Sequence, residues 1–311
     1  MGYFPMGDAV KNKEALTPRL RLYWILLRPR QWTKNAFVLA GVVFSGLFVR
    51  IEALFTALAA FFVFCLISSA AYVCNDIFDR KEDALHPLKR QRPLAAGSVT
   101  VSEARVLALI LFLTASGAAV AINRLFSLLV VSYFLLTVAY TLWLKQIVLI
   151  DLMALAAGFV LRAASGAVAV EVTISPWLLI CTTLLSLFLG LGKRRHELLL
   201  LQQNAADHRA ALDDYSPELL NQLLSSVTAA TLVSYSIYTF ISGHGAAMML
   251  TIPFVMFGLF RYLYLIYRRD LGGSPEEVLL TDRQLLITVI LWGIAVLLVL
   301  GAKRGGINWN A

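Results

Sequence analysis

Charged residues, cysteine and histidine are all scarce in this chain. Charged residues make up only 15% of its 311 positions, whereas 59% are hydrophobic, and the mean hydropathy is +0.75. Soluble domains carry about 25% charged residues, so the composition excludes a soluble globular protein and indicates one that lies in a lipid bilayer. The three cysteines stand alone in apolar segments and the four histidines form no i, i+4 pair. We therefore interpret the cysteines as packing residues and expect no helical zinc site.

Long hydrophobic runs dominate the rest of the sequence. Nine of them have about 17–25 residues, which is enough to cross roughly 30 Å of hydrocarbon as a helix. They cover residues 35–55, 56–76, 101–120, 125–143, 147–168, 174–192, 221–242, 246–266 and 284–302. The first two meet around Arg50 and Glu52, so eight or ten segments stay open as alternatives. The sequence predicts an all-α, polytopic membrane protein.

Helix-start signals precede two of these runs. Thr100 followed by Glu103 is a capping-box pattern, and Ser216 stands before Pro217, a residue that suits the first turn of a helix. We expect a helix to begin at each of these places.

Basic residues gather at one set of segment ends. Most of the 27 lysines and arginines lie in residues 1–34, 77–100, around Lys145, 193–220 and 267–283. By the positive-inside rule these ends face the cytoplasm, which predicts a multi-pass protein of the plasma (inner) membrane. The net charge of +8 is explained by this topology and by attraction to anionic lipid, so we expect the bilayer as a partner and no nucleic acid.

The expected organisation follows from these segments. Residues 1–34 form a cytoplasmic segment whose cationic part, from about 16 to 34, lies on the membrane surface as an amphipathic helix. Residues 35–302 form a single transmembrane domain with cytoplasmic loops 77–100 and 193–220. Residues 303–311 form a short tail on the outer side.

One charged stretch, NDIFDRKEDALHPLKRQRPLAAG at residues 75–97, directly follows an apolar run. If the helix continues past Cys74, three aspartates at spacings of i, i+3 and i+7 share one of its faces. Carboxylates so close together repel one another unless a cation neutralises them, and oxygen ligands favour Mg²⁺ or Mn²⁺. The predicted metal ligands are Asn75, Asp76, Asp79 and Asp83. The alternative is a solvated helix end whose charges only set the topology.

The basic half of the same stretch suits phosphate. Magnesium is commonly bound through one or two carboxylates together with substrate phosphates. Lys89, Arg90 and Arg92 would then hold phosphate oxygens directly. The stretch therefore predicts a site for a metal-bound diphosphate.

A second basic stretch, GKRRHELLLLQQ at residues 192–203, ends the sixth run. In a functional interpretation Lys193 and Arg194 bind a second phosphate, and Glu197 orients one of them or binds a sugar hydroxyl. A topology-setting cluster with a helical ion pair explains these residues equally well.

Polar residues also occur inside or beside the runs. Arg162, in LRAASGA, falls near the middle of the bilayer, and we expect it to face a cavity because a charge there is costly. Structural pairing is the alternative, and Asp151 could be its partner or line the cavity. In RPRQWTKN at residues 28–35, Lys34 and Asn35 lie deepest, so we expect them to contact substrate. The alternative is a basic run that only sets the topology.

These motifs, together with YTLWLKQ at residues 140–146, resemble the UbiA superfamily of intramembrane prenyltransferases from Arg28 onward. The resemblance implies nine transmembrane helices around a central cavity that opens to the cytoplasmic loops and laterally to lipid. It also adds Tyr140 and Lys145 to the expected substrate-binding residues.

The chain departs from the superfamily's pattern in one place. Members that use prenyl diphosphates have a second aspartate-rich motif after the sixth segment, where this chain has GKRRHE. With RPRQWTKN, RYLYLIYRRD and GGSPEEVLLTDRQ, this makes the chain similar to the decaprenyl-phosphate phosphoribosyltransferase branch. That resemblance implies transfer of 5-phosphoribose from phosphoribosyl diphosphate to a polyprenyl (decaprenyl) phosphate, a step towards arabinose donors for the arabinogalactan of the cell wall. An aromatic prenyltransferase of the same superfamily, a transporter or channel, and a homo-oligomeric state stay open.

The expected mechanism assigns roles to the charged residues singled out above. Asp76 and Asp79 hold Mg²⁺ on the donor's diphosphate so that its bond to C1 can ionise. Lys89 and Arg92 neutralise the leaving diphosphate, and Lys34 positions the lipid phosphate. Because that phosphate is anionic at neutral pH, it needs no general base. On this scheme Arg194→Ala mainly weakens donor binding.

Overall fold

Helices make up almost all of the described chain. The structure is a computed structural model, and it describes residues 19–85, 89–203, 214–241, 246–269 and 271–304. The eight long helices are α3 (Ile51–Phe78), α5 (Val101–Ile122), α6 (Arg124–Leu142), α7 (Ile150–Ala169), α8 (Pro176–Gln203), α10 (Pro217–Ile241), α11 (Ile252–Arg269) and α13 (Arg283–Arg304). No strand occurs within these ranges. The all-α prediction is confirmed.

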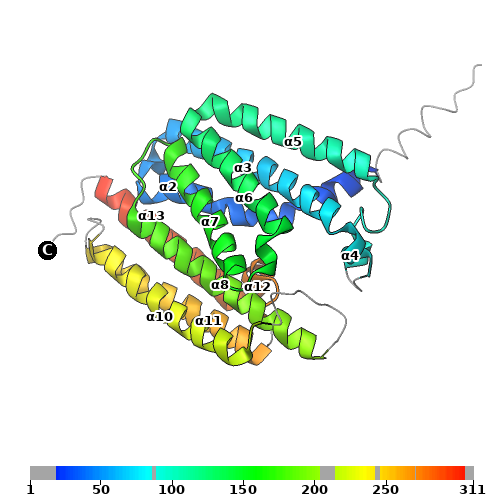
Figure 1. Cartoon of the computed structure of the whole chain (residues 1–311). Coiled ribbons are helices and arrows are strands. Elements are labelled where there is room, and N and C mark those ends of the chain that lie inside the picture. Colours follow the sequence, from blue (N-terminus) through cyan, green and yellow to red (C-terminus); the bar gives the residue numbers. More distant parts are fainter. Residues whose placement is uncertain (1–18, 86–88, 204–213, 242–245, 270, 305–311) are drawn as a thin grey trace, which may run out of the picture.

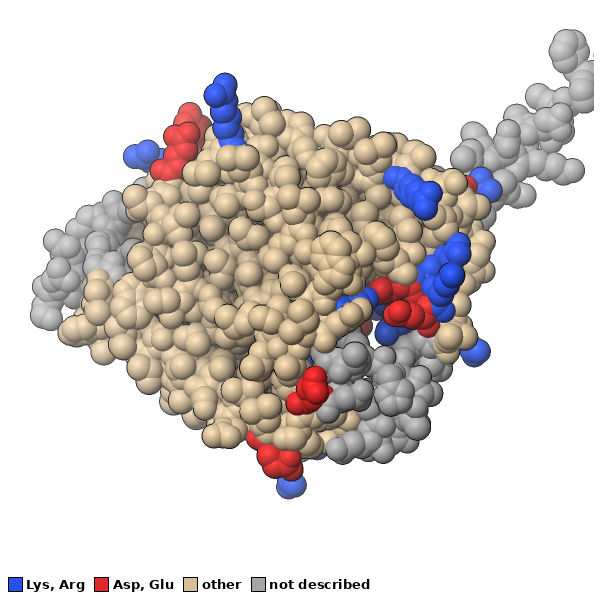
Figure 2. Space-filling model, in the orientation of Figure 1, with Lys and Arg blue, Asp and Glu red and all other residues tan. Residues whose placement is uncertain are grey.

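Eight helices in the described residues are long and apolar enough to cross a membrane. They match the predicted runs from 56–76 onward to within a few residues at most of their ends. The two helix-start signals are confirmed, since the Thr100 hydroxyl accepts from the Glu103 backbone N–H at 3.2 Å and α10 begins at Pro217. Figure 2 shows a broad uncharged belt between the charged residues of the two ends, as a bilayer requires.

The structure differs from expectation at residues 35–55. Here the chain forms η1 (Pro29–Leu39), α2 (Ala40–Phe44) and η2 (Leu47–Val49) in place of one helix, and a turn at Gly46, where φ is 69°, separates the last two. In Figure 1 this blue segment still runs from the α4 end of the bundle to the opposite end near α2. It therefore occupies the place of a ninth crossing segment in an irregular form.

Close backbone contact with α7 accompanies this irregular form. A Cβ added at Gly166 would lie 1.7 Å from the carbonyl oxygen of Val38, and one added at Gly41 would lie 2.6 Å from the backbone of Ala167. Only glycine permits the two backbones to approach so closely. The small residues of LRAASGA thus serve packing between α7 and η1.

Replacing Gly166 by alanine is expected to destabilise the fold by about 1–3 kcal/mol, because the added methyl overlaps the Val38 carbonyl and η1 must shift. Gly117→Ala is the matched control, since its Cβ meets no atom within 4 Å. That variant should be neutral or stabilised by up to about 1 kcal/mol. Thermal unfolding of both variants in detergent checks this, and equal melting temperatures would contradict the contact.

The N-terminal surface helix ends earlier than predicted. Residues 19–27 are helical, with Trp24 55% exposed, and the helix ends before Arg28, whose φ is 52°. Pro29 then begins η1, so the chain turns into the bundle five to six residues before the expected boundary near 34–35. Residues 1–18 and 305–311, which hold the rest of the predicted terminal segments, lie outside the described residues.

Candidate active site

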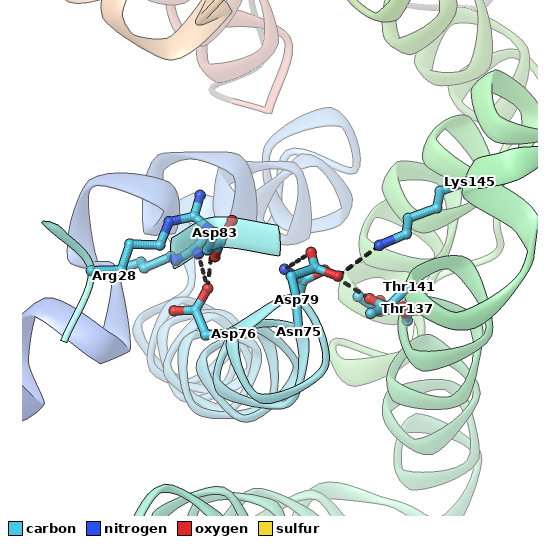
Figure 3. A network of polar contacts seen from close by, with 9 residues as sticks. Arg28, Asn75, Asp76, Asp79, Asp83, Thr137, Thr141 and Lys145 are labelled. Atoms are coloured by element: carbon cyan, nitrogen blue, oxygen red, sulfur yellow. Dashed lines mark hydrogen bonds and ion pairs between the residues drawn. The ribbon is translucent and has the colours of Figure 1, made fainter. Parts of the chain in front are cut away.

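The charged residues singled out in the sequence gather where α3 meets α4 (Arg80–Leu85), η3 (Lys89–Gln91) and η4 (Leu144–Gln146). Figure 3 shows this end of the bundle. Asn75 and Asp76 belong to the last turn of α3, and Asp79 directly follows it. Asp83 lies on α4, and Lys145 on η4.

Two of the carboxylates share one arginine. Asp76, which is 3% exposed, accepts hydrogen bonds from Arg28 and from Arg92, the latter at 3.2 Å. Arg92 also donates to Asp83 at 2.6 Å. Arg92 was expected to hold phosphate oxygens, and in the structure it lies between two predicted metal ligands. Lys89, three residues earlier, is exposed.

Asp79 points to a different cation. It accepts from the Lys145 ammonium at 2.7 Å and from the Asn75 amide at 2.9 Å, while Thr141 donates to the Asn75 carbonyl at 3.0 Å. Figure 3 shows Asp76 directed to Arg28 and Asp79 directed to Lys145. The expected single face of three carboxylates is therefore wrong for Asp79. Asp76 and Asp83 share Arg92, whereas Asp79, the residue after the end of α3, turns to Lys145.

The predicted metal ligands offer a divalent cation only carboxylate and amide oxygens. Within the described residues, no three Asp, Glu, His or Cys side chains converge closely enough to hold a metal by themselves. The set is nevertheless all oxygen, and Mg²⁺ usually takes only one or two protein carboxylates and completes its shell with water and substrate phosphate. The residues present fit a cation that is bound together with a phosphate ligand.

Arg194 lies in a second, closed network. Its guanidinium is 1% exposed and donates to Asp151 at 2.5 Å, to the Tyr140 hydroxyl at 3.0 Å and to Glu197. The Tyr215 hydroxyl donates to the other oxygen of Asp151 at 2.8 Å. Burial raises the pKa of Tyr215, and the neighbouring carboxylate raises it further, so this phenol stays a neutral donor.

This network bears on two expectations, the pairing of Asp151 with Arg162 and the binding of phosphate by Arg194. Asp151 is not the partner of Arg162, because Arg194 and Tyr215 occupy both of its oxygens. Arg194 was expected to grip a phosphate, but its guanidinium already faces two carboxylates and a phenol. Lys193 is the accessible member of the pair, with a side chain that is 41% exposed and lies 3.9 Å from Glu197.

Arg162 and Asn35 lie against each other inside the bundle. Asn35 is fully buried and accepts from Arg162 Nε at 2.9 Å, and Arg162 also donates to the Tyr133 hydroxyl at 2.6 Å. The Asn35 amide donates in turn to Ser68 at 3.2 Å. The structure therefore gives Arg162 the structural pairing described above as the alternative to a cavity-facing position. Asn35, which was expected to contact substrate, is instead buried against Arg162.

Two residues of this region were not recognised from the sequence. Arg28 is set against Asp76 by its left-handed backbone and stacks over the Tyr72 ring at 5.4 Å. Glu276, on α12 (Pro275–Thr281), accepts from Gln31 at 2.7 Å and lies 3.5 Å from the Lys34 ammonium. Burial raises the pKa of Glu276, but Lys34 and Gln31 outweigh it and hold the pKa below its ordinary value. The only sequence signal for Glu276 was its place in the quoted GGSPEE stretch.

Comparison with known proteins gives consistent matches. A model described as the UbiA prenyltransferase family matches residues 35–278. The decaprenyl-phosphate phosphoribosyltransferase of Corynebacterium glutamicum is 33% identical over 282 residues, covering 86% of this chain and 82% of that protein. The enzyme of the same name from Mycobacterium tuberculosis is 33% identical over 274 residues, covering 86% and 90%.

Solved structures show the same fold. A UbiA homologue from Archaeoglobus fulgidus, bound to GPP and Mg²⁺, superposes with a TM-score of 0.69 at 19% identity and covers 90% of this chain and 99% of its own. A structure described as digeranylgeranylglyceryl phosphate synthase in membranes gives a TM-score of 0.66 at 18% identity, covering 91% and 99%. At such identities the likeness concerns the arrangement of the helices.

Proposed function

This chain belongs to the UbiA prenyltransferase family, and from that premise we propose that it transfers 5-phosphoribose from phosphoribosyl diphosphate to decaprenyl phosphate and releases diphosphate. The names of relatives at 33% identity over most of the chain support this reaction. One structural observation carries it: the predicted metal ligands pair with Arg28, Arg92 and Lys145, whereas a second set of basic residues, Lys34 and Lys193, lies around Glu276. The proposed donor has phosphate at two separated places, and a prenyl diphosphate has it at one.

The carboxylate cluster would receive the diphosphate. Asn75, Asp76, Asp79 and Asp83 are the residues that would hold Mg²⁺, or Mn²⁺ with the same ligand preference, and the cation supplies positive charge to the leaving group. Arg28, Arg92 and Lys145 already lie beside these carboxylates and would bind phosphate oxygens. Lys89 is exposed on the segment that leads to Arg92 and would join them.

The remaining residues would position the sugar phosphate and the acceptor. Lys193 binds the 5-phosphate and is held by Glu197, which accepts from Arg194. The Arg194 guanidinium is fixed in turn by the Tyr140 hydroxyl. Lys34 binds the lipid phosphate, whose oxygen attacks C1 of ribose as the C1–O bond to diphosphate breaks. Arg162 and Asn35 support η1 beneath Lys34. We place this site at the cytoplasmic face of the plasma membrane, because the basic loops lie at this end of the bundle.

The test is transfer of label to lipid. Detergent-purified protein is incubated with Mg²⁺, decaprenyl phosphate and phosphoribosyl diphosphate labelled in the ribose. Label is expected in the organic phase, to fall to background with EDTA and to return with added Mg²⁺. Decaprenol, which lacks the phosphate, is the control acceptor and should stay unlabelled.

The opposite outcome is equally informative. No labelling of decaprenyl phosphate, from a preparation that joins a polyprenyl diphosphate to an aromatic acid, would overturn the proposal in favour of an aromatic prenyltransferase.

A further inference from the structure

Two buried polar atoms near the proposed site have no hydrogen-bond partner among the residues that the structure describes. One is Oε2 of Glu276, and the other is the hydroxyl of Tyr262 on α11. The side chain of Glu276 is 11% exposed and Tyr262 is 3% exposed. Tyr262 is within electrostatic range of Glu276, and the structure records no hydrogen bond between them. Buried polar atoms are nearly always satisfied, so such a pair calls for a third group.

The chemistry of the two atoms defines that group. The other oxygen of Glu276 is already engaged by Gln31 at 2.7 Å and Lys34 at 3.5 Å. With its pKa held below the ordinary value, the Glu276 carboxylate is ionised at neutral pH and only accepts hydrogen bonds. The Tyr262 phenol can donate. A group that donates to one and accepts from the other is a hydroxyl, either that of a water molecule or that of a ligand.

The position of Glu276 identifies which hydroxyl it would meet. Lys34, assigned to the lipid phosphate, lies 3.5 Å away, and Lys193, assigned to the 5-phosphate, is within electrostatic range. Tyr72, also within range, stacks on Arg28, which holds Asp76 of the diphosphate cluster. Glu276 therefore lies beside the groups assigned to the lipid phosphate and the 5-phosphate, and Tyr72 connects it to the diphosphate group. In the donor, the part between the 1-diphosphate and the 5-phosphate is the ribose ring.

The backbone before α12 holds Glu276 in this place. A Cβ added at Gly272 would lie 2.6 Å from the carbonyl oxygen of Gly192, and one at Gly273 would lie 2.6 Å from the His196 ring. These glycines let the segment pack directly on α8, next to Lys193. The short helix that carries Glu276 is thus fixed to the helix that carries the proposed 5-phosphate lysine.

We propose that Glu276 and Tyr262 form a subsite for a secondary hydroxyl of the donor's ribose, with Glu276 accepting from that hydroxyl and Tyr262 donating to it. The subsite rests on the proposed function and adds to it a reason for sugar selectivity. A site built to bind a hydroxyl rejects an analogue without it, because its own buried polar groups are then left unpaired. The pair would make this protein select ribose donors over deoxyribose donors.

The test measures selectivity. Transfer to decaprenyl phosphate is assayed with phosphoribosyl diphosphate and with its 2-deoxy and 3-deoxy analogues. The wild type should prefer the ribose donor over one of the analogues by about 100-fold or more in kcat/KM. Glu276→Gln and Tyr262→Phe should each lower that ratio by about tenfold, the loss expected for one such hydrogen bond. A substitution that only damages the fold would lower the rates with the ribose donor and with the deoxy donors equally, and the ratio would stay unchanged.

Each variant has a matched control. Glu277→Gln makes the same change at an exposed position of α12, and Tyr267→Phe removes an exposed α11 phenol that donates to Asn221. Both controls should keep the wild-type ratio.

Two results would overturn the subsite while leaving phosphoribosyl transfer in place. One is a wild-type protein that uses the ribose donor and both deoxy donors equally well. The other is that both site variants keep the wild-type ratio of kcat/KM values. Absence of transfer from phosphoribosyl diphosphate by the wild type would instead refute the proposed function itself. If Glu276→Gln fails to fold because Lys34 loses its partner, Tyr262→Phe decides alone.

Discussion

Replacing Asp76 by asparagine is expected to reduce phosphoribosyl transfer by about 10²–10³-fold, the scale seen when a group that stabilises transition-state charge is lost. Asp76 is 3% exposed and lies between Arg28 and Arg92. An asparagine has the same shape but no charge, so it would bind a divalent cation poorly and leave both arginines less well positioned. Initial rates at saturating Mg²⁺ measure the loss.

The matched control for this variant is Glu82→Gln on α4. Glu82 is exposed, and the substitution removes the same charge from the same end of the bundle. We expect its rate to stay within about twofold of the wild type, since surface charges contribute little. If the Asp76→Asn protein kept the wild-type rate, the assignment of Asp76 to the metal and diphosphate site would be wrong.

Arg194→Ala is expected to destabilise the protein by about 3–5 kcal/mol, the cost of leaving a buried charge without its partner. Asp151 is 0% exposed and would lose the guanidinium that lies 2.5 Å from it. This differs from the effect expected from the sequence alone, which was weaker donor binding. Detergent-soluble yield and the thermal unfolding midpoint measure the change.

Lys193→Ala is the control for Arg194→Ala. Lys193 is the preceding residue of α8, and its side chain is 41% exposed, so its loss should change stability by less than about 1 kcal/mol. If Lys193 binds the 5-phosphate, its removal should raise the donor KM by about tenfold, as expected for one charge-assisted contact.

The double variant Arg194→Met with Asp151→Leu should recover much of the lost stability, because it removes both buried charges. An Arg194→Ala protein that unfolds at the wild-type temperature and binds donor weakly would restore the phosphate-binding role.

The functional end of the bundle was only partly predictable. The sequence indicated the acidic cluster and the lysines from their local spacing, and Asp76, Asp83 and Arg92 do lie together. It did not indicate that Arg28 pairs with Asp76, since 48 positions separate them, or that Glu276 meets Gln31 across 245 positions. Spacing along one helix says which side chains share a face, but not which distant segment packs against that face.

By itself the sequence determined that this is an all-helical membrane protein, where most of its spanning helices begin and end, and at which end its charges collect. These properties are local, because hydrophobic length and helix capping depend on neighbours within a few residues. Only the tertiary structure decided that residues 35–55 form an irregular segment held at Gly166, that Arg194 is closed into a buried network, and that Glu276 reaches the site. Those outcomes depend on backbones and charges brought together from distant parts of the chain, where close approach and the choice of ion-pair partner are settled by packing.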